Sequence, residues 1–479
     1  MSERPSQALA EATQGANGGR RMLVLGLDCA TPQLVFDAWR MDLPNISRLM
    51  DEGAWGRMNS TIPAITVPAW TAMMTGRDPG ELGFYGFRNR ADYSYDRMTI
   101  ANASAVEHPR IWDLLSQKGG RVGVLGVPQT FPVRPVNGQM VSCFLTPSAK
   151  SEYTYPHELR DEIAGWLGEE FLVDVPNFRS DDKDRILRDI YRLADHHFDV
   201  AQHLLERDRY DFFMMVDMGV DRIHHAFWKY MASDHPKYEP NHRFERAIHD
   251  YYVHVDGRVG QLLELVDDET IVVVVSDHGA RTMAGGICIN EWLINEGYLV
   301  LKDRPTDVTA LEDCEIDWSR TRAWASGGYY GRLFMNVRGR EPEGVIDPLD
   351  YEAERDELVA RLATITDPDG APIGTVGHKP EELYREVRKI APDLIIYFGN
   401  LKWRSVGSVG FESIWTFEND TGPDEANHAQ EGIFVYNDPR NPQHGRDLGT
   451  VEIYDIGPTL LTALGQDVPE GLRGKAIEW

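Results

Sequence analysis

The chain has 479 residues, 42% of them hydrophobic and 10% aromatic, which is enough to bury a large globular core. A formal net charge of −27 and an isoelectric point near 4.9 give a surface that repels phosphate backbones, so the composition excludes a nucleic-acid polymer as the main partner. No apolar stretch is long enough to span a bilayer, which argues against a membrane partner. A small phosphorylated substrate is compatible with this charge, because bound cations would reverse the local field.

The N-terminal sequence predicts a tail followed by one large domain. Residues 1–21 are polar and rich in glycine and alanine, so we expect a flexible tail there and a folded domain over 22–479. The apolar run that follows the tail is too short for a signal peptide. The cysteines stand far apart without CxxC spacing: Cys29, Cys143, Cys288 and Cys314. We interpret them as reduced packing residues of a cytoplasmic protein, with a disulfide as the alternative.

Strand and helix patterns alternate along the chain. Runs rich in β-branched and aromatic residues predict strands at 22–28, 121–127, 139–145, 210–216, 271–275, 391–398 and 432–436. Proline starts, and apolar residues at three- and four-residue steps, predict helices at 44–54, 156–167, 182–207, 243–266 and 454–465. This order is typical of an α/β fold with a doubly wound, mostly parallel sheet flanked by helices.

The segment from about residue 290 to 425 departs from this alternation. It is polar and rich in glycine and proline, and we interpret it as an insertion or cap on the sheet. The strand at 391–398 is expected to return to the core. In the helix at 243–266, His249 and His254 lie off the apolar stripe, which predicts surface positions rather than metal ligands.

The strand at 271–275 is followed by two potential metal ligands. Its apolar β-branched residues are typical of a strand buried on both faces of a parallel sheet. Asp277 and His278 come after it, at the carboxyl end where open α/β sheets assemble ligand sites. A carboxylate beside an imidazole suits Zn²⁺ or Mn²⁺, although Asp-His also occurs in plain capping turns.

Other segments place ligand-type side chains near strand ends. Asp28 ends the first predicted strand, and Asp221 and His225 are four residues apart, on one face of a helix. His428 lies in a polar loop directly before the strand at 432–436. Taken singly, each has a simpler explanation: Asp28 would hydrogen-bond a loop, Asp221 and His225 would form a surface pair, and His428 would hold a turn.

A hydroxyl group is also positioned for phosphate chemistry. Thr66 precedes Pro68 in a short turn that suits the first turn of a helix, where the positive helix end can hold a phosphate. Its simplest role would be a helix N-cap, the commonest use of threonine at such a place. Three carboxylates, three imidazoles and one hydroxyl together are hard to explain as packing, so we interpret the set as a functional site.

Five motifs resemble those of a known family: GLDCATP, ITVPAWTAMMTG, DRIHH, SDHG and NHAQEG, in this order. They are similar to motifs of the alkaline phosphatase superfamily, and most of all to its type I phosphodiesterase/nucleotide pyrophosphatase family. The resemblance runs from about residue 22 to the GLRGK ending. It implies an alkaline-phosphatase-like fold in which residues 22–479 form the catalytic domain, with the insertion or cap at about 290–425.

The resemblance implies two divalent metal ions, usually zinc. One would be held by Asp28, Thr66, Asp277 and His278, and the other by Asp221, His225 and His428. Thr66 would be the nucleophile that becomes phosphorylated, and metal coordination is a standard means of activating a threonine hydroxyl. Asp-rich sites of this kind also accept Mn²⁺ or iron.

The resemblance to the family is weaker at the residues expected to contact the substrate. Nucleotide pyrophosphatases carry a transition-state asparagine after the nucleophile, and the simplest alignment places Phe87 there. Arg88 or Asn89 could instead bind the phosphoryl oxygens, and the bidentate, permanently charged Arg88 is the preferred candidate, with a solvated arginine as the alternative. Candidates for a nucleotide-base slot, each of which would as readily be a core residue, are Trp70, Tyr85, Phe87, Tyr329 and Tyr330.

The predicted function is metal-dependent hydrolysis of a small phosphodiester, of which a nucleotide is one candidate, through a phosphothreonine at Thr66. A threonine here disfavours a sulfatase, whose turn carries a cysteine or serine. The alternatives are a phosphomonoesterase or phosphonate hydrolase on the same site, and a catalytically silent binding protein on this fold. We expect a small phosphorylated substrate, no nucleic-acid polymer and no membrane as partners.

Overall fold

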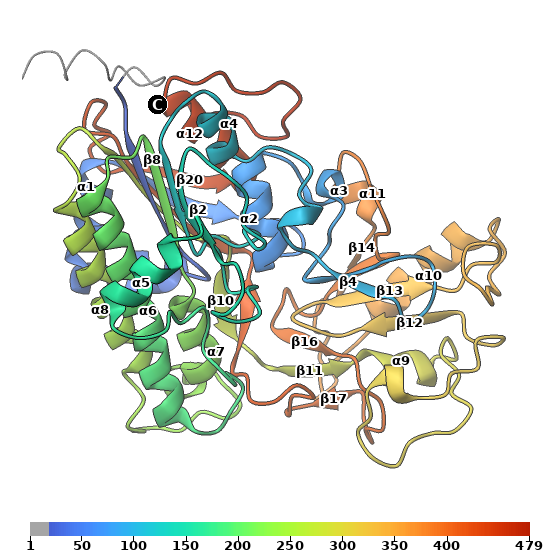
Figure 1. Cartoon of the computed structure of the whole chain (residues 1–479). Helices are drawn as coiled ribbons and strands as arrows, with labels where there is room; N and C mark the ends of the chain where they lie inside the picture. Colours follow the sequence, from blue (N-terminus) through green and yellow to red (C-terminus); the bar gives the residue numbers. More distant parts are fainter. Residues whose placement is uncertain (1–18) are drawn as a thin grey trace, which may run out of the picture.

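A nine-stranded sheet forms the centre of the molecule. The computed structural model describes residues 19–479, and Figure 1 shows the sheet with a smaller group of strands and helices beside it. The strand order is β20-β2-β19-β9-β1-β8-β5-β6-β7, with bounds β1 (Met22–Leu27), β2 (Ala54–Asn59), β5 (Val122–Leu125), β6 (Gly138–Val141), β7 (Thr154–Tyr155), β8 (Phe212–Asp217), β9 (Ile271–Val275), β19 (Glu431–Asn437) and β20 (Arg446–Glu452). Five neighbouring pairs are parallel, and only β19 and β7 run antiparallel to their neighbours. The predicted doubly wound, mostly parallel sheet is therefore confirmed.

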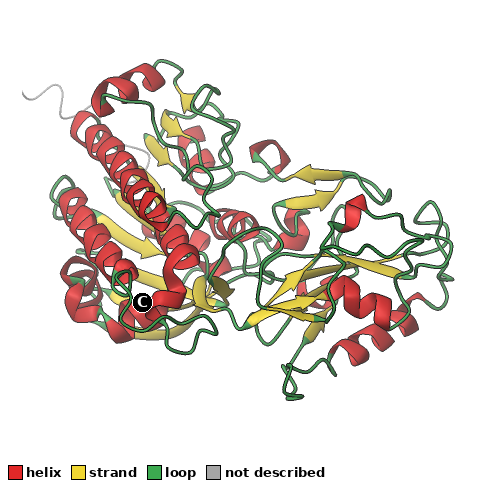
Figure 2. Ribbon diagram, turned by 90° about the horizontal axis from the view of Figure 1, so that it is seen from below, coloured by secondary structure: helices red, strands yellow, loops and turns green. Residues whose placement is uncertain are grey.

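Helices cover both faces of this sheet (Figure 2). One layer consists of α1 (Pro44–Glu52), α5 (Leu159–Leu167), α6 (Lys183–Arg207), α7 (Gly219–Met231) and α8 (Ala247–Leu263). The other consists of α2 (Thr66–Thr75), α4 (Ile111–Gln117) and α12 (Ile453–Ala463). Within residues 19–479, no helix combines the length and the apolar character that crossing a bilayer requires.

The sequence located most elements of this core to within a few residues. β9 covers the predicted strand at 271–275 and is buried along its whole length. On α8 the predicted apolar stripe faces inward, whereas His249 and His254 form ion pairs with acidic side chains, as expected of surface residues. Residues 1–18 of the predicted tail lie outside the described part of the chain, and Arg20, just before β1, forms an ion pair with Asp438 (2.5 Å).

The elements from β11 to β17, which we call the cap, have their own sheets and their own hydrophobic core. In Figure 1 the cap lies to the right of the nine-stranded sheet. Its elements are β11 (Gly285–Cys288), α9 (Ile289–Asn295), β12 (Ala323–Ser326), β13 (Gly331–Met335), α10 (Tyr351–Leu362), β14 (Val376–His378), α11 (Pro380–Leu383), β15 (Leu394–Tyr397), β16 (Trp403–Val406) and β17 (Trp415–Thr416).

One strand prediction is corrected by the cap. The apolar run at 391–398 contains β15, which pairs antiparallel with β13 and β14 in the four-stranded cap sheet and does not return to the core sheet. A buried apolar strand looks the same in sequence whichever sheet it joins, because only its pairing partners differ.

Five short elements lie between the main sheet and the cap. β3 (Arg88–Arg90) and β4 (Met98–Ile100) form a hairpin, α3 (Pro79–Leu82) is a single turn, and β10 (Gly279–Thr282) pairs with β18 (Ala426–Ala429). The β10–β18 pair joins the segment after β9 to the segment before β19. It therefore brings the NHAQEG motif to the SDHG motif.

Close packing of α2 on β1 depends on a glycine. A Cβ at Gly26 would lie 2.6 Å from Cη2 of Trp70 and 2.7 Å from Cγ2 of Val216. The missing side chain lets the Trp70 ring lie directly on the strand, with its indole N–H donating to Asp28 Oδ2 (2.6 Å). Because α2 starts at Thr66, this contact also sets the distance between Thr66 and the end of β1.

We expect Gly26→Ala to lower the free energy of unfolding by about 1–3 kcal/mol, since the added methyl forces Trp70 or Val216 to move. The control is Gly257→Ala in α8, where a Cβ meets nothing within 4 Å and where alanine should raise stability by up to about 1 kcal/mol. Chemical denaturation of both variants measures the difference. Equal stability of the two variants would contradict the packing argument.

Candidate metal centre

Seven predicted site residues converge at the carboxyl edge of the main sheet. The carboxyl ends of β1, β8 and β9 meet there because these strands are parallel neighbours. All seven residues are at most 3% exposed. They are Asp28 after β1, Thr66 at the start of α2, Asp221 and His225 on α7, Asp277 and His278 after β9, and His428 on β18. None of them is a surface pair or a solvated turn residue.

The first group surrounds the hydroxyl of Thr66. Its Oγ1 lies 3.4 Å from Nε2 of His278. The same Nε2 lies 3.2 Å from Oδ2 of Asp277 and 3.8 Å from Oδ1 of Asp28. Ile65 occupies the N-cap position of α2, so Thr66 is the first helical residue and its side chain faces the acidic cluster. The simple N-cap role considered for Thr66 is therefore not the observed one.

The second group lies beside the first. Nε2 of His225 is 3.2 Å from Oδ1 of Asp221, one helical turn away on α7, and Nε2 of His428 is 3.9 Å from the same oxygen. The rings of His428 and His278 stack with centroids 3.8 Å apart, which joins the two groups. Ligand atoms of Asp28, Asp277 and His278, and likewise those of Asp221, His278 and His428, lie within 4.8 Å of one another.

Buried atoms without hydrogen-bond partners show that this donor set fits metal ions. Asp28 Oδ1, Asp277 Oδ2 and His225 Nε2 are all buried, and none makes a hydrogen bond. A buried polar atom without a partner costs free energy, so native structures rarely leave one. Carboxylate oxygens and neutral imidazole nitrogens are the ligands that zinc and manganese take, and a cation at each group would satisfy all three atoms.

The ring nitrogens that face away from the centre are held by the protein. Nδ1 of His428 lies 2.9 Å from the carbonyl oxygen of Ala64, and Nδ1 of His278 lies 3.1 Å from that of Gly279. A carbonyl that accepts from Nδ1 fixes the tautomer in which Nε2 carries the free lone pair. Both imidazoles therefore present Nε2 to the centre.

Asp424 holds the third imidazole. This buried carboxylate, on the segment that leads from the cap to β18, lies 2.7 Å from Nδ1 of His225 through Oδ1. Its Oδ2 accepts from the hydroxyl of Tyr329 (3.0 Å) and from Nη2 of Arg179 (3.2 Å). Sequence reasoning missed Asp424, and its only sequence signal is an acidic residue close before His428.

Burial keeps two of the imidazoles neutral. It lowers the pKa of His278 to about 4, and burial and the neighbouring imidazoles of His278 and His225 lower the pKa of His428 well below its usual range. Burial raises the pKa values of Asp28 and Asp277 well above their usual range, and neighbouring carboxylates add to the rise: Asp277 and Asp221 for Asp28, and Asp221 for Asp277. Both effects have the same main cause, which is the free-energy cost of a charge in a buried site.

His225 is the exception in the metal-free protein. Burial alone would lower its pKa, but the carboxylates of Asp424 and Asp221 outweigh burial and raise it to about 9. Burial likewise opposes ionisation of Asp424, yet the facing charge of His225 and that of Arg179 lower its pKa to about 2. At neutral pH the pair is therefore an imidazolium and a carboxylate.

The two residues proposed for phosphoryl contacts are placed differently. Arg88 is exposed on β3, and its carbonyl accepts from the guanidinium of Arg332 in the cap. The amide of Asn89 serves its own loop, because Oδ1 accepts from the Tyr85 N–H (2.7 Å) and Nδ2 donates to the Gly86 carbonyl (3.0 Å). Between the two, Arg88 has the side chain with more freedom to reach a substrate.

The predicted aromatic candidates separate into core and site residues. Trp70, Tyr85 and Tyr330 are buried, as their alternative role in the core predicts. Phe87 is half-buried, with its ring centroid 6.0 Å from that of Phe144. Tyr329 is also half-buried, and its ring stacks on two proposed ligands, with centroids 4.1 Å from His428 and 4.8 Å from His225.

A sequence profile of the type I phosphodiesterase/nucleotide pyrophosphatase family matches residues 22–424, which is most of the chain. The chain belongs to this family. The match begins at β1 and includes six of the seven residues of the centre, all but His428. Family membership makes the protein a phosphoester hydrolase of the alkaline phosphatase superfamily, whose members depend on metal ions. No curated protein sequence matches the chain.

Solved structures share the fold over nearly the whole chain. Phosphonoacetate hydrolase from Sinorhizobium meliloti 1021, in complex with phosphonoformate, is 17% identical, with a TM-score of 0.60 and coverage of 93% of this chain and 95% of its own. Human ectonucleotide pyrophosphatase/phosphodiesterase 5 is 13% identical, with a TM-score of 0.55 and coverage of 96% and 97%. At such identities the likeness establishes the fold, and the fold alone.

Metal binding should displace a proton from His225. A pKa of about 9 keeps this imidazole protonated at neutral pH in the metal-free protein, whereas a ligand must be neutral. Zinc affinity of the second group should therefore rise from pH 7 to pH 9, by up to about tenfold per pH unit. Titration calorimetry in buffers of different ionisation enthalpy counts the proton released at pH 7.

The matched variant is Asp424→Asn, which keeps an oxygen near Nδ1 but removes the charge that raises the pKa of His225. It should release fewer protons at pH 7. At pH 9, where about half of His225 is already neutral in the wild type and proton competition is weak, the metal affinity of the variant should be about ten- to a hundredfold lower than that of the wild type. Wild-type proton counts and wild-type affinity in this variant would show that Asp424 does not support the ligand.

Proposed function

We propose that the protein hydrolyses a small phosphodiester through a phosphothreonine at Thr66, in a centre that holds two divalent metal ions, preferentially zinc. The observation that carries the proposal is the position of Thr66 Oγ1, 3.4 Å from His278 Nε2, among buried carboxylate and imidazole atoms that lack hydrogen-bond partners. A hydroxyl at such a place has no evident packing role. Family membership supports the same reaction class.

In the first step Thr66 Oγ1 attacks the phosphorus. The Oγ1–P bond forms, the bond from phosphorus to one ester oxygen breaks, and the alcohol leaves. Two divalent cations, held by Asp28, Thr66, Asp277 and His278 and by Asp221, His225 and His428, would favour the alkoxide of Thr66 and neutralise charge on the phosphoryl oxygens. The start of α2 adds the positive end of a helix at the same point.

In the second step water hydrolyses the phosphothreonine. A water oxygen forms the new bond to phosphorus, the Oγ1–P bond breaks, and Thr66 recovers its proton while a phosphomonoester leaves. Burial of the ligands keeps their geometry fixed through both steps, because each side chain is enclosed by β1, β9, α2, α7 and β18. A rigid, dry site strengthens every electrostatic contact with the phosphoryl group.

The structural neighbours supply two candidate substrate classes. One is described as an inactive threonine-to-alanine variant of murine ectonucleotide pyrophosphatase/phosphodiesterase 5 in complex with AMP, at 12% identity and coverage of 94% and 96%. The other, the phosphonoacetate hydrolase, binds a phosphonate. We favour a diester because three half-buried aromatic rings offer apolar surface to a second ester group. Tyr329 stacks on His428, Phe144 lies under the guanidinium of Arg222, which binds Asp221, and Phe87 contacts Phe144.

Replacement of the nucleophile tests the mechanism. Thr66→Ala should lower kcat for a phosphodiester by at least about a thousandfold, whereas Thr66→Ser, which keeps a hydroxyl, should retain part of the activity. Elemental analysis must show that both variants still bind metal. Full turnover by metal-loaded Thr66→Ala would overturn the proposal, and no bound metal with no hydrolysis in the wild type would favour a non-catalytic binding protein.

A comparison of substrates tests the ester class. We expect a higher kcat/KM for bis-p-nitrophenyl phosphate than for p-nitrophenyl phosphate or phosphonoacetate, since only the diester has a second ester group to pack against the aromatic rings. Release of p-nitrophenolate, or of inorganic phosphate from phosphonoacetate, gives the rates. A large preference for the monoester or the phosphonate would replace diester hydrolysis with the corresponding reaction.

A further inference from the structure

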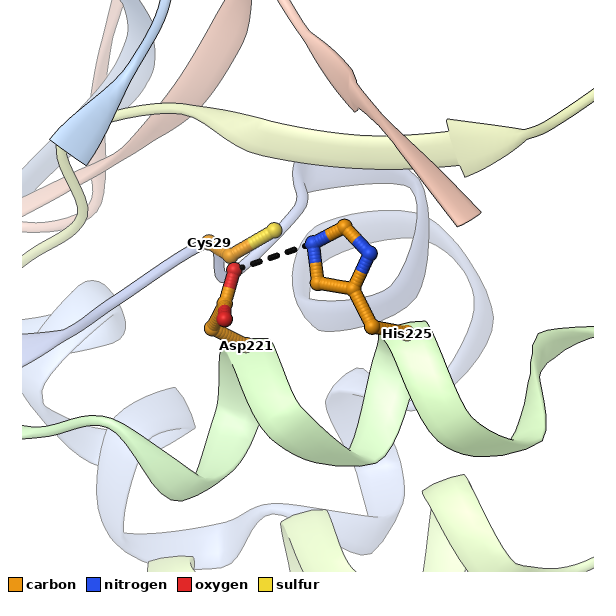
Figure 3. Close-up of side chains that lie close together, drawn as sticks. All are labelled: Cys29, Asp221 and His225. Carbon is orange, nitrogen blue, oxygen red and sulfur yellow. Dashed lines mark ion pairs between the residues drawn. The ribbon is translucent and has the colours of Figure 1, made fainter. Parts of the chain in front are cut away.

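A thiol lies inside the second ligand group. Cys29 follows Asp28 directly and has no solvent exposure. Its Sγ lies beside the side chains of Asp221 and His225 (Figure 3). Sγ, a carboxylate oxygen of Asp221 and a ring nitrogen of His225 all lie within 4.8 Å of one another. No comparable grouping joins Cys29 to Asp277 or His278, so the thiol belongs to the second group.

The nitrogen that faces the thiol needs a partner. His225 is 1% exposed, and its Nε2 makes no hydrogen bond, although Oδ1 of Asp221 is 3.2 Å away. Its other ring nitrogen is already held by Asp424. In Figure 3 the ring of His225 turns this free nitrogen toward Asp221 and Cys29. Three donor atoms of metal-binding type therefore surround one point, and the nitrogen cannot be satisfied from solvent.

Cys29 lies within the buried core around the main sheet, but packing alone does not account for a side chain at this backbone position. Its hydrogen bond, to the carbonyl oxygen of Gly279 (3.3 Å), is of the weak type that thiols make. The backbone of Cys29 has φ +67°, a conformation that glycine adopts without strain and that a side chain disfavours. A glycine would therefore suit the backbone better, and only the sulfur distinguishes the residue present.

We propose that Sγ of Cys29 is a ligand to the metal ion held by Asp221, His225 and His428. The proposal rests on the two-metal centre proposed above. As the bond from sulfur to metal forms, the thiol proton passes to solvent, and the thiolate supplies the electron pair. The ligand set becomes one sulfur, one oxygen and two nitrogens, which suits tetrahedral zinc.

A sulfur ligand would make the two metal positions chemically different. Soft thiolates favour zinc over manganese, whereas carboxylate and hydroxyl oxygens accept both ions. The second position should therefore select zinc, while the first position, with Asp28, Thr66, Asp277 and His278, should be less selective. A protein supplied with both ions would then hold zinc at the second position.

X-ray absorption spectroscopy of the zinc-loaded wild-type protein tests the proposal directly. A sulfur shell should appear at about 2.3 Å, beyond the nitrogen and oxygen shell at about 2.0–2.2 Å. Cys29→Ser should lose the sulfur shell. The control Cys288→Ser, which replaces a buried cysteine of the cap, should keep it. Cys29→Gly, which suits the left-handed backbone, gives a second variant in case the serine impairs folding.

Metal affinity provides the second readout. Chelator competition should show zinc affinity at the second position falling by at least about tenfold in Cys29→Ser and Cys29→Gly, with a smaller change for manganese. A wild-type spectrum without sulfur, or no zinc bound, would overturn the proposal. If sulfur is absent while metal-dependent diester hydrolysis persists, the ligand assignment fails and the proposed function stands. If the sulfur shell is present but no diester is hydrolysed, the ligand assignment stands and the proposed function fails.

Discussion

The parallel pairing of β1 with β8 on one side and with β9 on the other is the constraint on which the centre depends. Its register sets Gly26 opposite both Val216 and Val275, so the three strands end together. The residues that follow them come from distant parts of the sequence yet meet within a few ångströms. The antiparallel pairs of β19 with β9 and of β18 with β10 then add His428 from the C-terminal part. A change in either register would separate the ligands, since each is fixed to the strand or helix that carries it.

The burial of several ionisable groups at this edge of the sheet costs free energy. Burial and the repulsion between carboxylates raise the pKa values of Asp28 and Asp277, and the imidazoles beside them are too deeply buried to protonate readily, apart from His225. The protein offsets part of this cost with fixed donors, such as the Trp70 indole on Asp28 and the guanidinium of Arg222 on Asp221 (2.5 Å). The remaining unpartnered atoms are the ones that face inward. Bound cations would satisfy these atoms and offset the repulsion between the carboxylates.

The cap also contributes to the centre. Tyr329, between β12 and β13, stacks on two of the imidazoles and donates to Asp424, and Asp424 in turn holds His225. Arg332 on β13 donates to the carbonyl of Arg88, so the same part of the cap also contacts the hairpin after the nucleophile. The cap therefore also fixes the orientation of the His225 imidazole, through Tyr329 and Asp424.

The sequence by itself determined the fold class, the ends of the main strands and the identity of the seven residues of the centre. Apolar runs, helical spacing and short motifs are local signals. Such signals were enough to identify Asp277, His278 and the Asp221–His225 pair as candidate site residues. Tertiary structure alone decided the rest. Contacts between distant segments decide which sheet β15 joins, what Asp424 and Tyr329 contact, and that Cys29 lies beside Asp221 and His225. The local sequence around one residue does not specify such contacts. In the sequence, Cys29 looks like any other buried cysteine. Only the packing of β1 against α7 places its sulfur beside Asp221 and His225.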